Sequence, residues 1–197
     1  MLISLVYFKM SISCVPFVVE KWKELYRAYL KLIYMIFYHK FEVRWSDLDA
    51  NKHLANSSYV QYCAQSRMAF MTKEKMGVTQ LSRWGIGPVI LHERYSFFKE
   101  IYADQTVIVS LEIDGCSEDS SIYRFLHKFY TPDGVHCATA EATGVWIDMM
   151  LRKMTTPPDD VVEAMNKYKS PETIVMSRED FKKLPFKPDN VDPAEFN

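Results

Sequence analysis

Residues 57–77 read SSYVQYCAQSRMAFMTKEKMG, and this stretch decides the fold of the chain. Apolar and aromatic side chains recur at three- and four-residue steps from Tyr59 to Phe70, which predicts one long helix. Asn56 or Ser57 is a suitable N-cap, and the glycine that closes the stretch is a suitable end. Because apolar residues occur almost all round this helix, we expect it to be buried on more than one side.

Strands are predicted on both sides of the helix. Residues 36–45 are aromatic and β-branched with partial alternation, which is typical of a strand. The later segments read as four strands over residues 89–99, 105–116, 120–131 and 134–149, followed by a short helix over residues 159–168. A Thr-Pro-Asp-Gly turn at residues 131–134 suits a hairpin. One sheet covers a helix all round only if it curves, so we predict an α+β fold, a curved antiparallel sheet wrapped around one long central helix.

The two ends of the chain differ from this central part. We expect residues 1–34 to form an N-terminal extension, residues 35–169 the folded domain, and residues 170–197 an extended C-terminal arm. Residues 21–38 carry Lys and Arg between apolar residues at helical spacing, which predicts an amphipathic helix that can associate weakly with a membrane. The alternatives are that this helix packs on its own domain, or that translation starts at Met35.

The composition is that of an ordinary globular protein. Hydrophobic residues make up 48% of the chain and charged residues 25%, and the formal net charge is -1. Nucleic-acid binding normally needs a strongly basic surface, so we predict no nucleic-acid partner. The four cysteines are far apart in the sequence and form no C-x-x-C pair. We interpret them as reduced thiols of a cytoplasmic protein.

A dense polar stretch, SDLDANKHLANSS at residues 46–58, lies between the first strand and the long helix. Its acidic and amide side chains at alternate positions imitate the start of a calcium loop. Such a loop needs Gly at its sixth position and Glu at its twelfth, where this chain has Lys52 and Ser58. A zinc site would need further His or Cys ligands, and His53 has none nearby in the sequence. We therefore predict no metal site.

Two interpretations of this polar stretch remain. Asp and Asn side chains often bond their own backbone in turns, so a purely structural role is one of them. The other rests on position, because Asp49 and His53 directly precede a helix N-terminus, whose free N–H groups stabilise an oxyanion. A carboxylate at that place can attack a carbonyl or activate water. These are the parts needed to hydrolyse an activated acyl group.

The stretch from residue 44 to residue 67, RWSDLDANKHLANSSYVQYCAQSR, resembles the hotdog-fold thioesterases of the 4-hydroxybenzoyl-CoA thioesterase type. It is most similar to the plant-type acyl-ACP thioesterases, whose pattern is R-W-S-D-x-D-x-N-x-H-x-N-N-x-x-Y. The matching residues are Arg44, Trp45, Ser46, Asp47, Asp49, Asn51, His53, Asn56 and Tyr59. The resemblance continues loosely to about Pro158. It implies a hotdog fold, and a homodimer or homotetramer with active sites at the dimer interface.

By this resemblance the chain is an acyl-CoA or acyl-ACP thioesterase, which hydrolyses a thioester to a free acid and a thiol. The resemblance implies that Asp49 is the catalytic nucleophile or general base, and that Asn51 and His53 orient the thioester or the water. Backbone N–H groups at the start of the helix would polarise the thioester carbonyl. The residues implied in substrate binding are Asn56, Ser57, Ser58 and Tyr59. No metal or redox cofactor is implied.

The chain also departs from this family. Ala55 replaces an asparagine, and Ala64 stands where many bacterial relatives carry a helix Glu. Glu100 aligns loosely with the Glu of a plant-type Glu-Cys pair, but Ile101 replaces the Cys, so a cysteine mechanism is unsupported. Two other functions stay open. A hotdog enoyl-CoA hydratase is one, although its D-x-N-P-x-H pattern has a different spacing, and a non-catalytic hotdog protein that binds acyl-CoA is the other.

Overall fold

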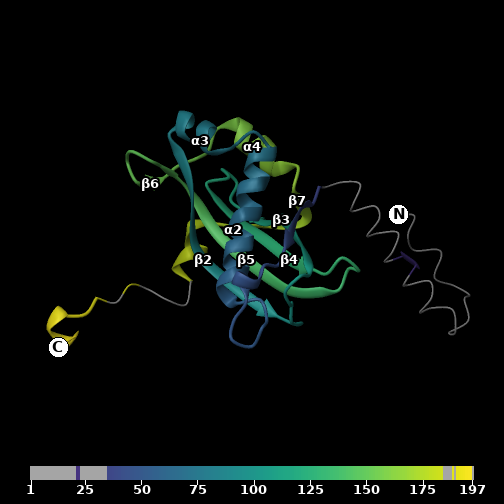
Figure 1. Ribbon diagram of the computed structural model, residues 1–197. Helices are drawn as coiled ribbons and strands as arrows, with labels where there is room; N and C mark the ends of the chain where they lie inside the picture. The colour runs from purple at the N-terminus through teal and green to yellow at the C-terminus, as the bar shows by residue number, and fades with distance from the viewer. Residues whose placement is uncertain (1–20, 23–34, 184–187, 189, 197) are drawn as a thin grey trace, which may run out of the picture.

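The computed structural model describes residues 21–22, 35–183, 188 and 190–196. A seven-stranded sheet curves around one long helix, α2, which spans Asn56–Lys73 (Figure 1). The predicted α+β architecture is therefore confirmed. The amphipathic helix predicted over residues 21–38 falls mostly on residues 23–34, which lie outside the described residues. None of the described helices has the length and apolar character needed to cross a lipid bilayer.

The main path of the sheet has the strand order β1-β3-β4-β5-β2, with β6 beside β5 and β7 beside β3. The strands are β1 Phe37–Glu42, β2 Ile86–Phe97, β3 Thr106–Cys116, β4 Ile122–Tyr130, β5 His136–Asp148, β6 Lys153–Met154 and β7 Lys169–Val175. All strand pairs are antiparallel except β7, which runs parallel to β3. Since β7 lies in the segment predicted as a C-terminal arm, that segment adds a strand to the sheet. The predicted limits of the domain stay a prediction.

The helices correct two details of the sequence interpretation. Besides α2, the structure has α3 Val78–Trp84, α4 Asp159–Asn166, α5 Arg178–Lys182 and the 3-10 turns η1 Trp45–Asp47 and η2 Pro193–Phe196. The helix α4 was predicted and α3 was not. The helix α2 ends before Gly77, because Lys75 adopts a left-handed φ of 62° and the Met76 N–H bonds the Met71 carbonyl. Gly77 is instead the N-cap of α3.

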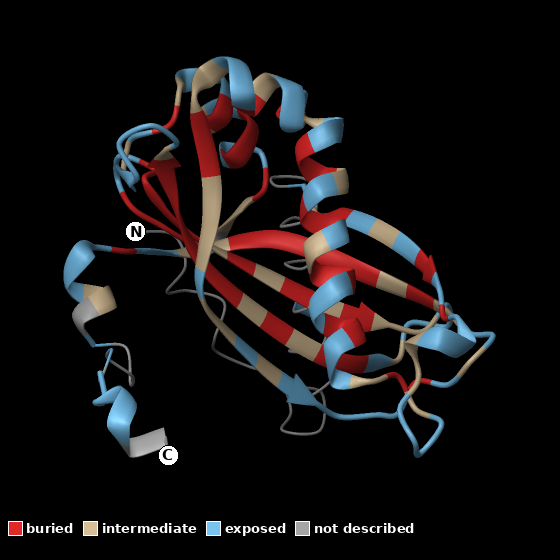
Figure 2. Ribbon diagram, turned by 60° about the vertical axis from the view of Figure 1, so that its left-hand side comes forward, coloured by how far each residue is buried: buried red, intermediate tan, exposed pale blue. Residues whose placement is uncertain are grey.

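The core lies between α2 and the concave face of the sheet. Alternate residues of β3, from Val107 to Ile113, are at most 1% exposed, and small residues of β5 such as Ala140 are buried with them. Figure 2 shows the buried side of α2 turned toward the strands. The opposite side of α2 is open, since Val60 is 40% and Met68 38% exposed. The expectation of a helix buried on more than one side is therefore wrong for a single chain.

Candidate active site

Asp47 ties the loop before α2 to the helix. Its Oδ2 accepts hydrogen bonds from the Arg44 N–H at 2.9 Å and from the Tyr62 hydroxyl at 2.8 Å. Its backbone carbonyl accepts the Ser58 hydroxyl at 2.8 Å and the Ala55 N–H at 2.9 Å. Burial, and then the hydrogen bond to Asp47, raise the pKa of Tyr62. Asp47 thus holds the loop against α2 through its Oδ2 and its backbone carbonyl.

Asp49 shapes the tight turn that follows. Its Oδ1 accepts the N–H groups of Asn51 at 2.8 Å and His53 at 3.2 Å. The turn is closed by backbone bonds between residues 49 and 53 and by Lys52, whose φ is 66°. No hydrogen bond is formed to Oδ2 within the described part of the chain. One oxygen of the carboxylate therefore fixes its position, and the other is left for a ligand.

Asp49 opens onto a pocket of about 370 Å³. This pocket lies between the loop, the first turn of α2 and the end of β2. The lining residues are Asp49, His53, Leu54, Asn56, Tyr59, Phe97, Phe98, Lys99, Glu100 and Ile101. Two segments that are far apart in the sequence thus form one site at the N-terminal end of α2.

The start of α2 differs from the predicted cap. The N-cap residue is Ala55, which offers no side-chain hydrogen bond, so the prediction of Asn56 or Ser57 is wrong. The loop supplies the anchoring bonds instead, and the Ser58 and Tyr59 N–H groups already bond the Ala55 carbonyl. Within the described residues, no acceptor is bonded to the N–H groups of Asn56 and Ser57. These two donors are the free positive end of the helix dipole beside the pocket.

Aromatic side chains make the apolar wall of the pocket. Tyr59, only 4% exposed, contacts Phe97 edge-on with ring centroids 4.9 Å apart, and Phe129 stands behind it at 5.0 Å. Burial is the largest cause that raises the pKa of Tyr59 to about 12, so its hydroxyl stays neutral. Phe97 and Phe98 are 49% and 62% exposed. The wall is therefore incomplete in a single chain.

His53 and Glu100 face each other across the pocket mouth. Their Nε2 and Oε2 atoms are 3.6 Å apart, and the side chains are 30% and 60% exposed. The neighbouring Ile101, which stands in place of the plant-type cysteine, is fully buried and has no nucleophilic atom. Among the described residues, no group of three His, Cys, Asp or Glu side chains is arranged to hold a metal ion.

The structure brings together some of the predicted site residues and separates others. Asp49, His53, Asn56 and Tyr59 line the pocket, whereas Asn51 and Ser57 are exposed outside its lining. Ser58 is buried, and its hydroxyl serves the loop rather than the pocket. The catalytic and binding roles assigned to these seven residues stay predictions.

Leu54 and three residues at the end of β2 and just after it line the pocket but were not found from the sequence. The three are Phe97, Phe98 and Lys99. They end a predicted strand, and nothing in their spacing connects them to the polar stretch. The signal that could have found them is the exposure of two adjacent phenylalanines at a strand end, where alternation should bury only one of them.

Arg67, at the centre of α2, forms an ion pair inside the fold. Its Nη1 donates to Glu93 Oε1 at 3.0 Å, and Arg67 is 9% exposed in all. The pair crosses from α2 to β2 inside the fold, away from the pocket lining.

Comparison with known proteins decides the family. The family model of the thioesterase-like superfamily matches residues 43–165. The chain belongs to this superfamily. Its hotdog fold is confirmed by solved structures that resemble it, as the sequence resemblance implied.

Two of these structures are thioesterases for dihydroxynaphthoyl-type CoA esters. A 1,4-dihydroxy-2-naphthoyl-CoA thioesterase from Synechocystis is 16% identical, with a TM-score of 0.61 over 67% of this chain and 96% of that one. A DHNA-CoA thioesterase from Staphylococcus aureus is also 16% identical, with a TM-score of 0.61 over 67% and 89% of the two chains.

A third similar structure is a hypothetical protein from Staphylococcus aureus in complex with CoA. It is 17% identical, with a TM-score of 0.62 over 81% of this chain and 98% of that one. No curated protein matches the chain. At these identities the structural likeness shows the fold alone, so the chemistry of this superfamily member must be argued from its own pocket.

Proposed function

We propose that this protein is a thioesterase that hydrolyses an acyl-CoA to a free acid and CoA. The observation that carries the proposal is that Asp49 and Asn56, the first residue of α2, line one pocket, beside the unbonded N–H groups of Asn56 and Ser57 at the start of the helix. A carboxylate and two helix N-terminal donors supply both halves of acyl transfer, an attacking or base group and a site for the oxyanion.

The reaction follows from this geometry. The thioester carbonyl oxygen sits at the N–H groups of Asn56 and Ser57, and the acyl group lies along the wall formed by Tyr59 and Phe97. Asp49 Oδ2 either takes a proton from a water that attacks the carbonyl carbon, or attacks that carbon itself and is then released by water. The carbon–sulfur bond breaks, and the thiolate leaves and takes up a proton. His53 orients the water or the thioester at the pocket mouth.

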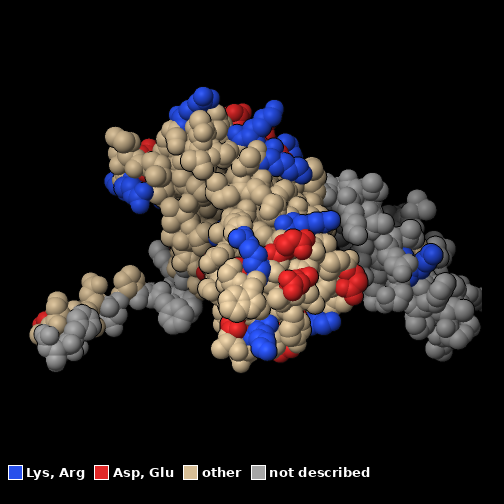
Figure 3. All heavy atoms as spheres, viewed as in Figure 1, with Lys and Arg blue, Asp and Glu red and all other residues tan. Residues whose placement is uncertain are grey.

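The placement of charge favours CoA over an acyl carrier protein as the acyl donor. A carrier protein is acidic and would need a basic rim around the pocket. Figure 3 shows Lys and Arg at the end that carries α3 and α4, about 27 Å along α2 from the pocket, whereas toward the opposite end they are interspersed with Asp and Glu. Lys99 lines the pocket, and Lys52 belongs to the loop beside it, which suits the few phosphates of one CoA. The CoA complex of the similar Staphylococcus protein supports the same choice.

A thiol-release assay tests the proposal. The purified protein is mixed with aryl, short-chain, medium-chain and long-chain acyl-CoAs and with an acyl carrier protein ester, and free thiol is measured. We expect thiol release from at least one CoA ester. Loss of an enoyl-CoA absorbance without thiol would instead indicate a hydratase, and binding without either reaction would indicate an acyl-CoA-binding protein. Either result would overturn the proposal.

We also propose that two copies of the chain pair along β2. This strand is the edge of the sheet, and within the described residues only its β5 side is paired. Leu91 lies at a bulge in β2 and is 52% exposed, and the open side of α2 exposes Val60 and Met68. An unpaired strand edge with apolar neighbours favours a self-complementary, twofold interface. Such a partner would also cover the exposed aromatic wall of the pocket.

Sedimentation velocity tests this pairing. The wild-type protein is expected to sediment as a dimer or tetramer, and Leu91→Asp to shift it toward monomer, because a carboxylate would be buried at the interface. Val175→Asp is the matched control, since Val175 is 73% exposed on β7 at the other side of the sheet. A wild-type monomer, or equal effects of the two variants, would contradict the proposal.

Location and membrane contact stay predictions of the sequence. The three described cysteines, Cys63, Cys116 and Cys137, are buried free thiols, which suits the reducing cytoplasm. Weak membrane association through residues 21–38 is testable by vesicle co-sedimentation of the full chain.

A further inference from the structure

Two short backbone segments hold His53 and Glu100 together at the pocket mouth. The Leu54 N–H donates to the Ile101 carbonyl at 2.7 Å, and His53 and Tyr102 form an antiparallel bridge. This bridge joins the loop before α2 to the segment that follows β2. The neighbouring side chains of His53 and Glu100 are therefore set by the backbone to within 3.6 Å of each other.

Tyr102 is a third member of this group. Its hydroxyl donates to Glu100 Oε2 at 2.6 Å, and its ring lies edge-on to the His53 ring with centroids 5.0 Å apart. Its own N–H donates to Gln105 Oε1 at 3.0 Å, which fixes the backbone at this residue. The hydrogen bond to Glu100 is the largest cause that raises the pKa of Tyr102, so the hydroxyl stays protonated and remains a donor.

The two contacts of Glu100 differ in strength. An O–H···O⁻ distance near 2.6 Å is that of a short, charge-assisted hydrogen bond, whereas 3.6 Å to the histidine nitrogen is beyond ordinary hydrogen-bond length. The Glu100 side chain is 60% exposed and would otherwise sample several rotamers. Tyr102 is therefore the stronger of the two restraints that keep the carboxylate beside the imidazole.

We propose that Tyr102 is a positioning residue, whose hydroxyl holds the Glu100 carboxylate against His53 Nε2 and so fixes the orientation of the imidazole at the pocket. This inference rests on the proposed thioesterase function. A carboxylate beside Nε2 favours the tautomer with its proton on that nitrogen and leaves Nδ1 as an acceptor. The Nδ1 atom of His53 can then accept a hydrogen bond from a water and hold that water in one orientation, without the imidazole turning between turnovers.

The test uses Tyr102→Phe, which keeps the ring and its contact with His53 and removes only the hydroxyl. We expect kcat to fall by about tenfold, with KM within about twofold, since one hydrogen bond to a charged group is lost. In a Glu100→Gln background the same substitution should cause no further loss, because both changes act through one carboxylate. Tyr38→Phe, at a 54% exposed tyrosine of β1 outside the pocket lining, is the control and should match the wild type.

A second readout is independent of turnover. The nitrogen-15 NMR spectrum of the His53 imidazole, assigned with His53→Gln, reports its tautomer. We expect the spectrum of Tyr102→Phe to show a mixture of the two His53 tautomers, and the spectrum of Tyr38→Phe to match that of the wild type.

Several outcomes would overturn the inference. An unchanged kcat in Tyr102→Phe would do so, and so would a rise in KM alone, which would mean that the hydroxyl contacts the substrate. Additive losses from Tyr102→Phe and Glu100→Gln would likewise exclude a shared action. If the wild-type protein releases no thiol from any ester, the proposed function fails, and the His53 spectrum then decides the positioning role by itself.

Discussion

Asp49→Asn is expected to lower kcat/KM for thioester hydrolysis by about 10²- to 10⁴-fold, the range for loss of a positioned acid–base group. The asparagine oxygen can still accept the Asn51 and His53 N–H groups that Asp49 Oδ1 accepts at 2.8 and 3.2 Å. The turn should therefore keep its shape while the negative charge is lost. Thiol release measured at several substrate concentrations separates kcat from KM, and we expect the loss in kcat.

The control for this variant is Asp159→Asn. Asp159 is an exposed carboxylate in the first turn of α4 and takes no part in the pocket. The Asp159→Asn variant should hydrolyse thioesters at the wild-type rate. Unchanged kcat in Asp49→Asn, with thermal unfolding like that of the wild type, would contradict the catalytic role of Asp49. Glu100 and His53 would then be the remaining candidates for the general base.

The fold was largely predictable because its main signals are local. The apolar spacing of residues 57–77 predicted α2, and the strand-like segments predicted β1 to β5, since periodicity reports burial directly. The helix α3 was missed because it has only seven residues, too few for a periodic pattern. The end of α2 was misplaced because Lys75 takes the left-handed conformation that glycine usually supplies.

The pocket was only half predictable, for a different reason. Asp49 and His53 stand out in the sequence because polar residues are concentrated around them. Phe98 and Lys99 join them only through the bridge between the loop before α2 and the segment after β2, which is a tertiary contact. The N-cap was wrong for a related reason, because bonds from the loop through Asp47 replaced the capping side chain that local rules expect.

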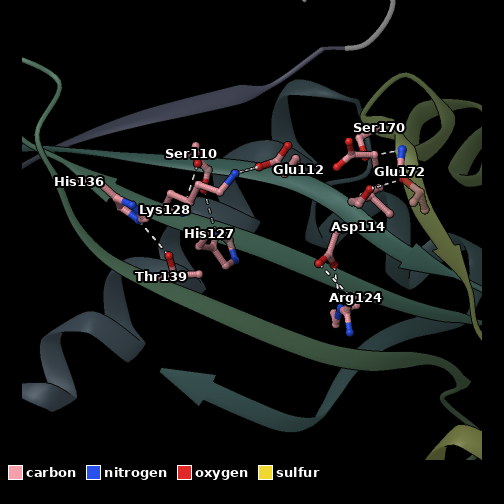
Figure 4. A network of polar contacts seen from close by, with 12 residues as sticks. Ser110, Glu112, Asp114, Arg124, His127, Lys128, His136, Thr139, Ser170 and Glu172 are labelled. Carbon is pink, nitrogen blue, oxygen red and sulfur yellow. Dashed lines mark hydrogen bonds and ion pairs between the residues drawn. The ribbon is translucent and has the colours of Figure 1, made fainter. Parts of the chain in front are cut away.

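His127 is expected to make the protein lose stability as the pH falls from about 6.5 toward 3. This side chain is fully buried on β4 under α2, and its Nδ1 lies 3.1 Å from the Ser110 carbonyl (Figure 4). Burial, and then the charge of Arg67, lower the pKa of His127 to about 3, against a partial opposing effect of the bond to Ser110. Among the described residues its Nε2 has no hydrogen-bond partner, so a proton there would be buried and uncompensated.

The direction of this change in stability with pH follows from proton uptake. In the unfolded chain the histidine binds a proton below about pH 6.5, whereas in the folded chain it does so only near pH 3, so the unfolded state binds more protons in between. The contribution of His127 to the free energy of unfolding is fully present above pH 6.5. It falls by up to about 5 kcal/mol at pH 3, at about 1.4 kcal/mol per pH unit. Urea unfolding followed by circular dichroism from pH 7 to pH 4, at one protein concentration, measures this slope.

His127→Gln isolates the contribution of this one residue. Glutamine can still donate to the Ser110 carbonyl but does not titrate, so the variant should unfold with a shallower dependence on pH between 6.5 and 4. His136→Gln, at the exposed start of β5, should keep the wild-type slope. Carboxylates contribute to acid unfolding equally in all three proteins, and the difference between the slopes therefore belongs to His127. Equal slopes for His127→Gln and the wild type would mean that acid unfolding is governed by the carboxylates alone.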